Sequence, residues 1–128
     1  ALHVFQERIE FLESDLFDKV PQGMQFDFIA SNPPYITSQE YAALDDTVRK
    51  FEPRLALEAG ADGLSVIRRL VPQAAERLRA GGVLAFEISP SIVDEATRLV
   101  TESGWFETPE VIKDLANQPR VIVGKKKV

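Results

Sequence analysis

The chain has 128 residues, of which 45% are hydrophobic and 27% charged, and its formal net charge at pH 7 is −5. This composition is typical of one globular domain, and a mildly acidic chain disfavours a partner that is recognised by its phosphates. The lack of cysteine and the presence of a single histidine, His3, exclude disulfides, thiolate sites and sites of several histidines, so we expect no bound metal.

The first half of the chain holds two strand candidates. Residues 8–13 alternate polar and apolar side chains, which predicts a half-buried strand. Residues 26–31 form a short apolar run that stops at Pro33 and Pro34, where a strand must end because proline cannot donate a ladder hydrogen bond. The polar stretch 36–62 that follows is typical of a functional loop.

A helix is predicted next, because the apolar side chains of residues 64–78 share one helical face. Pro72 predicts a kink or a break within it, and the pair Gly81-Gly82 predicts its end. We expect the basic side chains off the apolar face to be a solvated surface: Arg68, Arg69, Arg77 and Arg79.

The rest of the chain predicts further strands and one more helix. Residues 83–88 read as a buried parallel strand, and residues 91–94 have the spacing of a capping box for a helix that ends near Gly104. Residues 110–114 and 120–124 predict a closing antiparallel pair, followed by a solvated lysine tail at 125–127. The order of elements predicts an α/β fold on a largely parallel sheet.

The candidate site is the motif Asn32-Pro33-Pro34-Tyr35, which directly follows an apolar strand. Ligands of open α/β sheets bind at the carboxyl ends of the strands, and the two prolines stiffen this corner. The Asn32 side-chain oxygen and the Pro33 carbonyl can then accept both hydrogens of a planar NH2 group, while Tyr35 stacks on its plane. This arrangement directs the nitrogen lone pair of an amide or a base amine toward an electrophile by positioning alone.

The motif and the residues around it resemble a known enzyme family. The segment FDFIASNPPYI resembles the amino-methyltransferase motif of S-adenosylmethionine-dependent enzymes, and Asp15-Leu16-Phe17 is similar to their element that contacts the cofactor's adenine. The blocks at 51–63 and 78–87 are similar to one branch, the HemK/PrmC glutamine N5-methyltransferases of peptide chain release factors. One departure is the sequence Glu87-Ile88-Ser89-Pro90, where the family usually has a glycine soon after the acid.

The resemblance implies a Rossmann-like class I S-adenosylmethionine-dependent methyltransferase fold. Residues 1–128 would be the C-terminal portion of the catalytic domain, without the first two strands and the glycine-rich loop, and inactive in isolation. Cofactor binding would use Asp15, Leu16 and Asn32. Substrate binding would use the four residues 32–35, with Asn32, Pro33 and Tyr35 acting in catalysis.

The resemblance also implies which molecules the protein would bind, and it leaves two alternative functions open. Release factors would be the substrate, and a strand left without neighbours at 8–13 and an open edge at 26–31 predict self-association. No apolar run reaches the roughly 20 residues of a membrane span and no secretory signal is evident, so we expect a cytoplasmic protein. An amino-methyltransferase that acts on a DNA or RNA base, and a non-catalytic binding or assembly module, remain alternatives.

Overall fold

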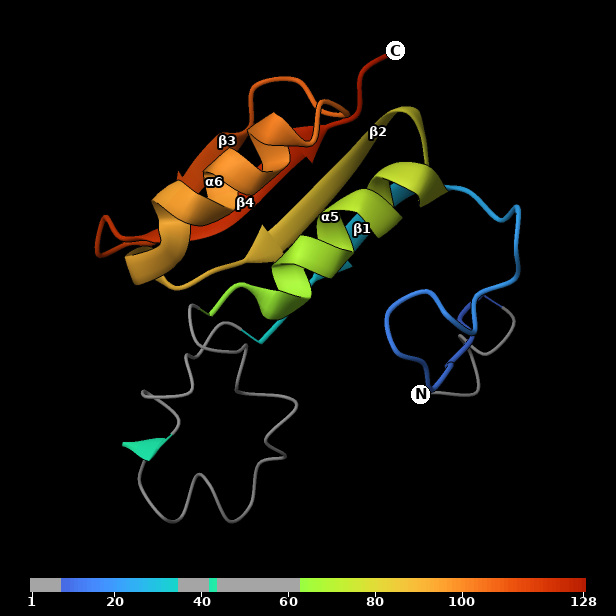
Figure 1. Cartoon of the computed structure of the whole chain (residues 1–128), viewed down its shortest axis with the longest axis horizontal. Coiled ribbons are helices and arrows are strands. Elements are labelled where there is room, and N and C mark those ends of the chain that lie inside the picture. Colours follow the sequence, from blue (N-terminus) through green and yellow to red (C-terminus); the bar gives the residue numbers. More distant parts are fainter. Residues whose placement is uncertain (1–7, 35–41, 44–62) are drawn as a thin grey trace.

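The computed structural model describes residues 8–34, 42–43 and 63–128 (Figure 1). Within these residues the chain forms four strands, two α-helices and one short 3-10 helix, in the order β1 (Phe26–Ser31), α5 (Ser65–Arg77), β2 (Leu78–Glu87), η1 (Pro90–Ile92), α6 (Val93–Glu102), β3 (Glu110–Lys113) and β4 (Pro119–Lys125). The loop prediction for residues 36–62 lies almost wholly outside the described residues.

The four strands form one mixed sheet in the order β1-β2-β4-β3. β1 and β2 are parallel, whereas β4 runs antiparallel to both β2 and β3. The closing antiparallel pair is therefore confirmed, and parallel pairing among the described strands is confined to β1 and β2. The connection from β1 to β2 includes α5, as expected for parallel neighbours that cannot be joined by a tight turn.

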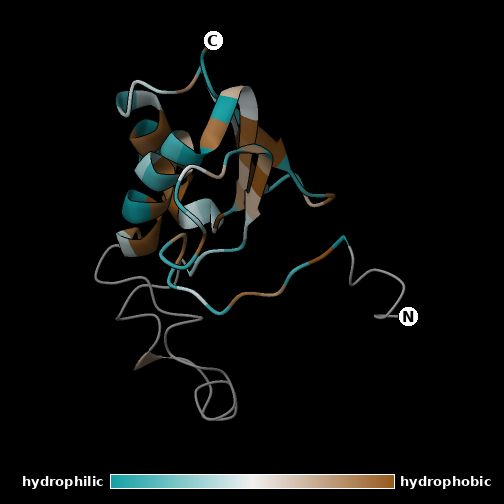
Figure 2. Cartoon of the chain, turned by 90° about the vertical axis from the view of Figure 1, so that its right-hand side faces the viewer, coloured by the Kyte–Doolittle hydropathy of each residue, from teal (hydrophilic) through white to brown (hydrophobic). Residues whose placement is uncertain are grey.

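The core lies between this sheet and the two α-helices, which cover the same face (Figures 1 and 2). From Gly82 on, every second residue of β2 is buried in this core, and Leu84 and Phe86 are almost completely buried. Helix α5 contributes five buried side chains at helical spacing: Ile67, Leu70, Val71, Ala74 and Ala75. The expected apolar face of this helix is thus the face that packs on the sheet.

Of the kink or break predicted at Pro72, the break is wrong, because α5 is one helix from Ser65 to Arg77 with Pro72 inside it, and the kink stays a prediction. Pro72 lies on the exposed side of the helix. Buried residues flank it on both sides along the opposite face, and their packing on the sheet keeps the two halves of the helix together. Tertiary packing therefore overrides the local penalty of proline.

The predicted role of the glycine pair is also wrong. Helix α5 ends at Arg77, and both Gly81 and Gly82 lie inside β2. A register shift between β1 and β2 occurs here, with Phe26 opposite Leu78 and Phe28 opposite Val83. Gly81 has φ +81°, a left-handed conformation that glycine adopts readily. The pair therefore shapes a bulge in the strand, which the helix periodicity could not indicate.

The capping box predicted at residues 91–94 does not form. The side chain of Ser89 instead accepts a hydrogen bond from the Ser91 backbone N–H at 3.4 Å, and η1 precedes α6. Helix α6 begins after Ile92 with no side-chain cap. Its end is as predicted, since Gly104 follows shortly after Glu102 with φ +80°.

The strand predicted at residues 8–13 is absent, and this segment forms no regular element. Phe11 is 81% exposed and Leu12 is 56% exposed, so the alternating pattern has no surface on which to pack. A strand needs a neighbour that satisfies its backbone groups, and the described residues provide none at this place. β1 lies at one edge of the sheet (Figure 1).

The C-terminal lysines are not a simple solvated tail. Lys126 forms an isolated bridge with Phe106, and its ammonium donates a hydrogen bond to the Leu78 carbonyl at 2.7 Å. The same ammonium lies 5.8 Å from the centre of the Trp105 ring, within range of a cation–π contact.

No helix of the described residues is long and apolar enough to cross a membrane.

Candidate active site

The motif lies where the sequence places it, at the carboxyl end of β1. β1 ends at Ser31, and the next residue, Asn32, is exposed, whereas Pro33 is buried and Pro34 half-buried. The Asn32 side chain makes no hydrogen bond with the described residues, so its amide oxygen is available to a ligand. Tyr35 lies outside the described residues.

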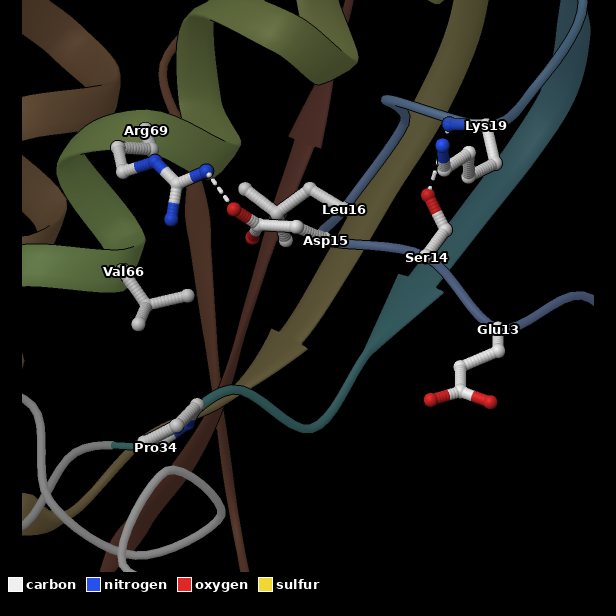
Figure 3. Close-up of a pocket in the computed structure, with 8 residues that line it drawn as sticks. All are labelled: Glu13, Ser14, Asp15, Leu16, Lys19, Pro34, Val66 and Arg69. Carbon is white, nitrogen blue, oxygen red and sulfur yellow. Dashed lines mark hydrogen bonds and ion pairs between the residues drawn. The ribbon is translucent and has the colours of Figure 1, made fainter.

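A pocket of about 830 Å³ opens beside the motif (Figure 3). Three chain segments meet around it: residues 13–19, the end of the motif and the first turns of α5. Its lining residues are Glu13, Ser14, Asp15, Leu16, Lys19, Pro34, Val66 and Arg69. The structure therefore brings both predicted cofactor residues of this segment, Asp15 and Leu16, to the same pocket as Pro34, although Pro34 lies 18 positions after Leu16 in the sequence.

The segment around Leu16 is a tight turn with a strained backbone. Leu16 has φ +53°, a left-handed conformation that costs a non-glycine residue about 1 kcal/mol or more. Neighbouring hydrogen bonds hold it, from Asp18 N–H to the Asp15 carbonyl at 3.1 Å and from Lys19 N–H to Ser14 Oγ at 2.9 Å. Leu16 also packs against the core cluster, so local bonds and burial together maintain the strain at this pocket.

Arg69 is a pocket residue that the sequence analysis assigned to a solvated surface. Its Nη2 donates a hydrogen bond to Asp15 Oδ2 at 2.8 Å, which ties α5 to the turn (Figure 3). The hydrogen bond to Asp15, followed by the charges of Asp15 and Asp18, raises the pKa of the Arg69 guanidinium. Local sequence patterns could not reveal the pair, because 54 positions separate its members.

Two more of these arginines also have partners in the same region. Arg77 donates to the carbonyl of Pro21 at 2.7 Å, and Arg79 donates to the carboxylate of Asp27 at 2.8 Å. Arg69 and Arg79 are exposed, as expected of a solvated surface, and Arg77 is half-buried; all three in addition link α5 and the start of β2 to residues 15–27. These contacts fix the segment that lines the pocket relative to the sheet.

The pocket lining combines apolar surface with one hydrogen-bond acceptor. Leu16, Pro34 and Val66 offer apolar surface for a flat heterocycle, and the carboxylate of Asp15 offers an acceptor for an amino group at its edge. Arg69 occupies only Asp15 Oδ2, so Oδ1 remains for a ligand. In the described part of the chain, no group of three histidine, cysteine or acidic residues could hold a metal ion.

Comparison with known proteins shows a consistent relationship in sequence. The chain is 44% identical over 116 residues to the release factor glutamine methyltransferase of Rhodopirellula baltica. The aligned region covers 91% of this chain and 39% of that protein. It is 39% identical over 121 residues to the release factor glutamine methyltransferase of Koribacter versatilis. Here the aligned region covers 94% of this chain and 42% of that protein. The similarity to the release factor glutamine methyltransferases is confirmed. The chain spans about two fifths of the length of these relatives.

No family model matches the chain. Solved structures agree in fold, including a methyltransferase from Pyrococcus furiosus, with a TM-score of 0.54, 16% identity, and coverage of 82% of this chain and 43% of that one. The Mtq2 and Trm112 complex of E. cuniculi, which methylates the termination factor eRF1, matches with a TM-score of 0.58, 18% identity, and coverage of 91% and 60%. The chain therefore has part of the Rossmann-like class I methyltransferase fold.

Proposed function

We propose that the protein methylates the side-chain amide nitrogen of a glutamine in peptide chain release factors, with S-adenosylmethionine as the methyl donor. The observation that carries this proposal is the exposed Asn32 at the carboxyl end of β1, beside a pocket that contains Asp15 and Leu16. The sequence relatives are named for this activity. Because the chain spans about two fifths of their length, the test requires the complete gene product that contains this sequence.

Asn32 and Pro33 hold the amide to be methylated. A planar NH2 group has two hydrogens, and the Asn32 side-chain oxygen and the Pro33 carbonyl each accept one of them. Because both N–H bonds are fixed, the nitrogen lone pair is directed out of the amide plane, toward an electrophile. Pro33 and Pro34 restrict the backbone at this corner, so the acceptors are preorganised before the substrate binds.

The cofactor side of the site is the pocket beside Asp15. S-adenosylmethionine supplies an electrophilic methyl group on a sulfonium when it is bound. Asp15 would accept a hydrogen bond from the adenine amino group, and Leu16 would pack against the ring. Tyr35, which lies outside the described residues, would stack on the substrate amide as the sequence predicts, and the proton released from the nitrogen would pass to water.

The charges of the described residues favour a protein substrate over a nucleic acid. Arg69, Arg79 and Arg120 are each paired with an aspartate, which leaves less positive charge to contact phosphates. The same acceptor pair would also hold the exocyclic amine of adenine, so methylation of DNA or RNA is the outcome that would replace this proposal. Transfer of labelled methyl groups to a release factor, to DNA and to RNA distinguishes the two.

The role of Asn32 is tested by Asn32→Ala in the complete protein. Loss of one preorganised acceptor is expected to lower kcat for release factor methylation by about 100- to 1000-fold. The matched control is Gln25→Ala, which removes an exposed amide side chain at the other end of β1 and is expected to leave turnover unchanged. Unchanged turnover in the folded Asn32→Ala variant would remove Asn32 from the mechanism.

A further inference from the structure

The ends of β1 and β2 continue side by side beyond the last paired residues. Ser31 is paired with Phe86 in the parallel register, which places Asn32 next to Glu87. Burial alternates in step along both segments, since Asn32 and Glu87 are exposed, whereas Pro33 and Ile88 are buried. Asn32 and Glu87 are therefore neighbours at the ends of the two strands, and both side chains are exposed.

Glu87 lies on the face of the sheet that the helices do not cover. Phe86, which precedes Glu87, is buried in the core beneath the helices, so Glu87 points to the opposite side. The strand neighbours of Asn32 and Glu87 on this side are apolar: Ala30, Ala85 and Val121. Among these strand neighbours, Glu87 is the one polar group beside Asn32.

An asparagine that accepts a hydrogen bond from a substrate must keep its oxygen turned toward it. The two ends of the amide have nearly the same shape, and the flipped amide would set its own N–H donors against those of the substrate NH2 group. A carboxylate accepts hydrogen bonds and donates none when ionised. A carboxylate next to the amide nitrogen therefore selects the orientation that the reaction needs.

We infer that Glu87 is a positioning residue that accepts a hydrogen bond from the side-chain nitrogen of Asn32 and so turns the Asn32 oxygen toward the substrate amide. This inference rests on the function proposed above. The side chain of Glu87 makes no hydrogen bond with the described residues and is free to take this role. It acts through Asn32 and does not contact the transferred methyl group.

The kinetic test uses Glu87→Ala and Glu87→Gln in the complete protein. Glu87→Ala is expected to lower kcat by about 10- to 100-fold with little change in KM for the cofactor, because it misplaces the acceptor and leaves the pocket intact. Glu87→Gln is expected to lower kcat less than Glu87→Ala does, since its side-chain oxygen still accepts although its NH2 group can also donate to a flipped Asn32. Glu110→Ala is the matched control, because Glu110 is an exposed glutamate on the same face of the sheet, in β3.

A second measurement does not depend on activity. The side-chain NH2 signals of Asn32, assigned by their loss in Asn32→Ala, are expected to shift in Glu87→Ala and to remain in place in Glu110→Ala. If the protein shows no methyltransferase activity but the Asn32 signals still shift in Glu87→Ala, the proposed function is refuted and the contact between Asn32 and Glu87 is supported. Unshifted signals, or a Glu87→Gln variant as slow as Glu87→Ala, would overturn the inference.

Discussion

At the residue scale, Asp114 shows how one carboxylate organises a turn. It lies between β3 and β4, where its Oδ1 accepts hydrogen bonds from the backbone N–H groups of Ala116 at 2.9 Å and Gln118 at 3.0 Å. Its Oδ2 accepts one from Arg120 Nε at 2.8 Å. The bond from Arg120, followed by that from Gln118, lowers the pKa of Asp114 below its usual value. The hairpin turn therefore depends on the ionised form of this residue.

This dependence predicts a loss of stability in acid. Because the pKa of Asp114 is lower in the folded state, its stabilisation is complete above the unfolded value of about 3.9 and is lost as pH falls through the folded value. The difference in free energy of unfolding between the wild type and Asp114→Asn is expected to shrink as pH decreases from about 6 to below 3. Urea denaturation across this range measures it. A constant difference would contradict the prediction, and Glu110→Gln is the control that keeps the wild-type pH dependence.

At the element scale, the bulge in β2 is decided by a close contact of backbones. A Cβ atom on Gly82 would lie 2.9 Å from the Arg79 carbonyl oxygen and 3.0 Å from that of Asp27. Both atoms belong to backbone that the sheet holds in place, so neither can easily move away. Gly81 has open space around it and is restricted by its positive φ alone.

The contact predicts that Gly82→Ala destabilises the chain by about 1–3 kcal/mol, because it forces a shift between β1 and β2. Thermal or urea unfolding measures the change in the free energy of unfolding. Gly81→Ala is the comparison variant, and it is expected to cost about 1–2 kcal/mol through backbone strain without disturbing the contact between the strands. A Gly82→Ala variant as stable as the wild type would show that the close approach is absent.

At the scale of the whole molecule, helices cover one face of the sheet (Figure 2), and β1 is an edge strand among the described residues (Figure 1). Phe28 of β1 is 58% exposed, and the apolar side chains of residues 9–12 are also exposed. An edge strand with apolar side chains offers unpaired backbone groups to another chain. The self-association expected from the sequence stays a prediction, and this edge is where it would occur.

The 128-residue chain is therefore expected to form oligomers at micromolar concentration, which light scattering would measure. Phe28→Lys is expected to shift the distribution toward the monomer, because a charge on an edge strand opposes pairing. Leu115→Lys is the matched control, since it replaces an exposed apolar residue in the β3–β4 turn. A wild-type chain that is monomeric, with residues 9–13 flexible by NMR, would contradict the prediction.

Much of this molecule follows from short-range patterns. The strand at 26–31, the apolar face of α5, the final hairpin and the exposed Asn32 at a strand end depend on side-chain periodicity and on proline, which act over a few residues. The motif of residues 32–35 likewise carries its chemical meaning in the order of its residues. The sequence could therefore indicate the fold class and the position of the candidate site.

Contacts between distant residues decided the rest. Packing on the sheet keeps α5 intact at Pro72, a backbone contact with Asp27 places Gly82 inside a strand, and Asp15 is paired with Arg69. Residues 8–13 carry a strand pattern but form no strand, because the described residues offer them no neighbour. The same register that pairs β1 with β2 sets Glu87 beside Asn32. No local pattern contains these outcomes, since each depends on which segments far apart in the chain meet in the folded protein.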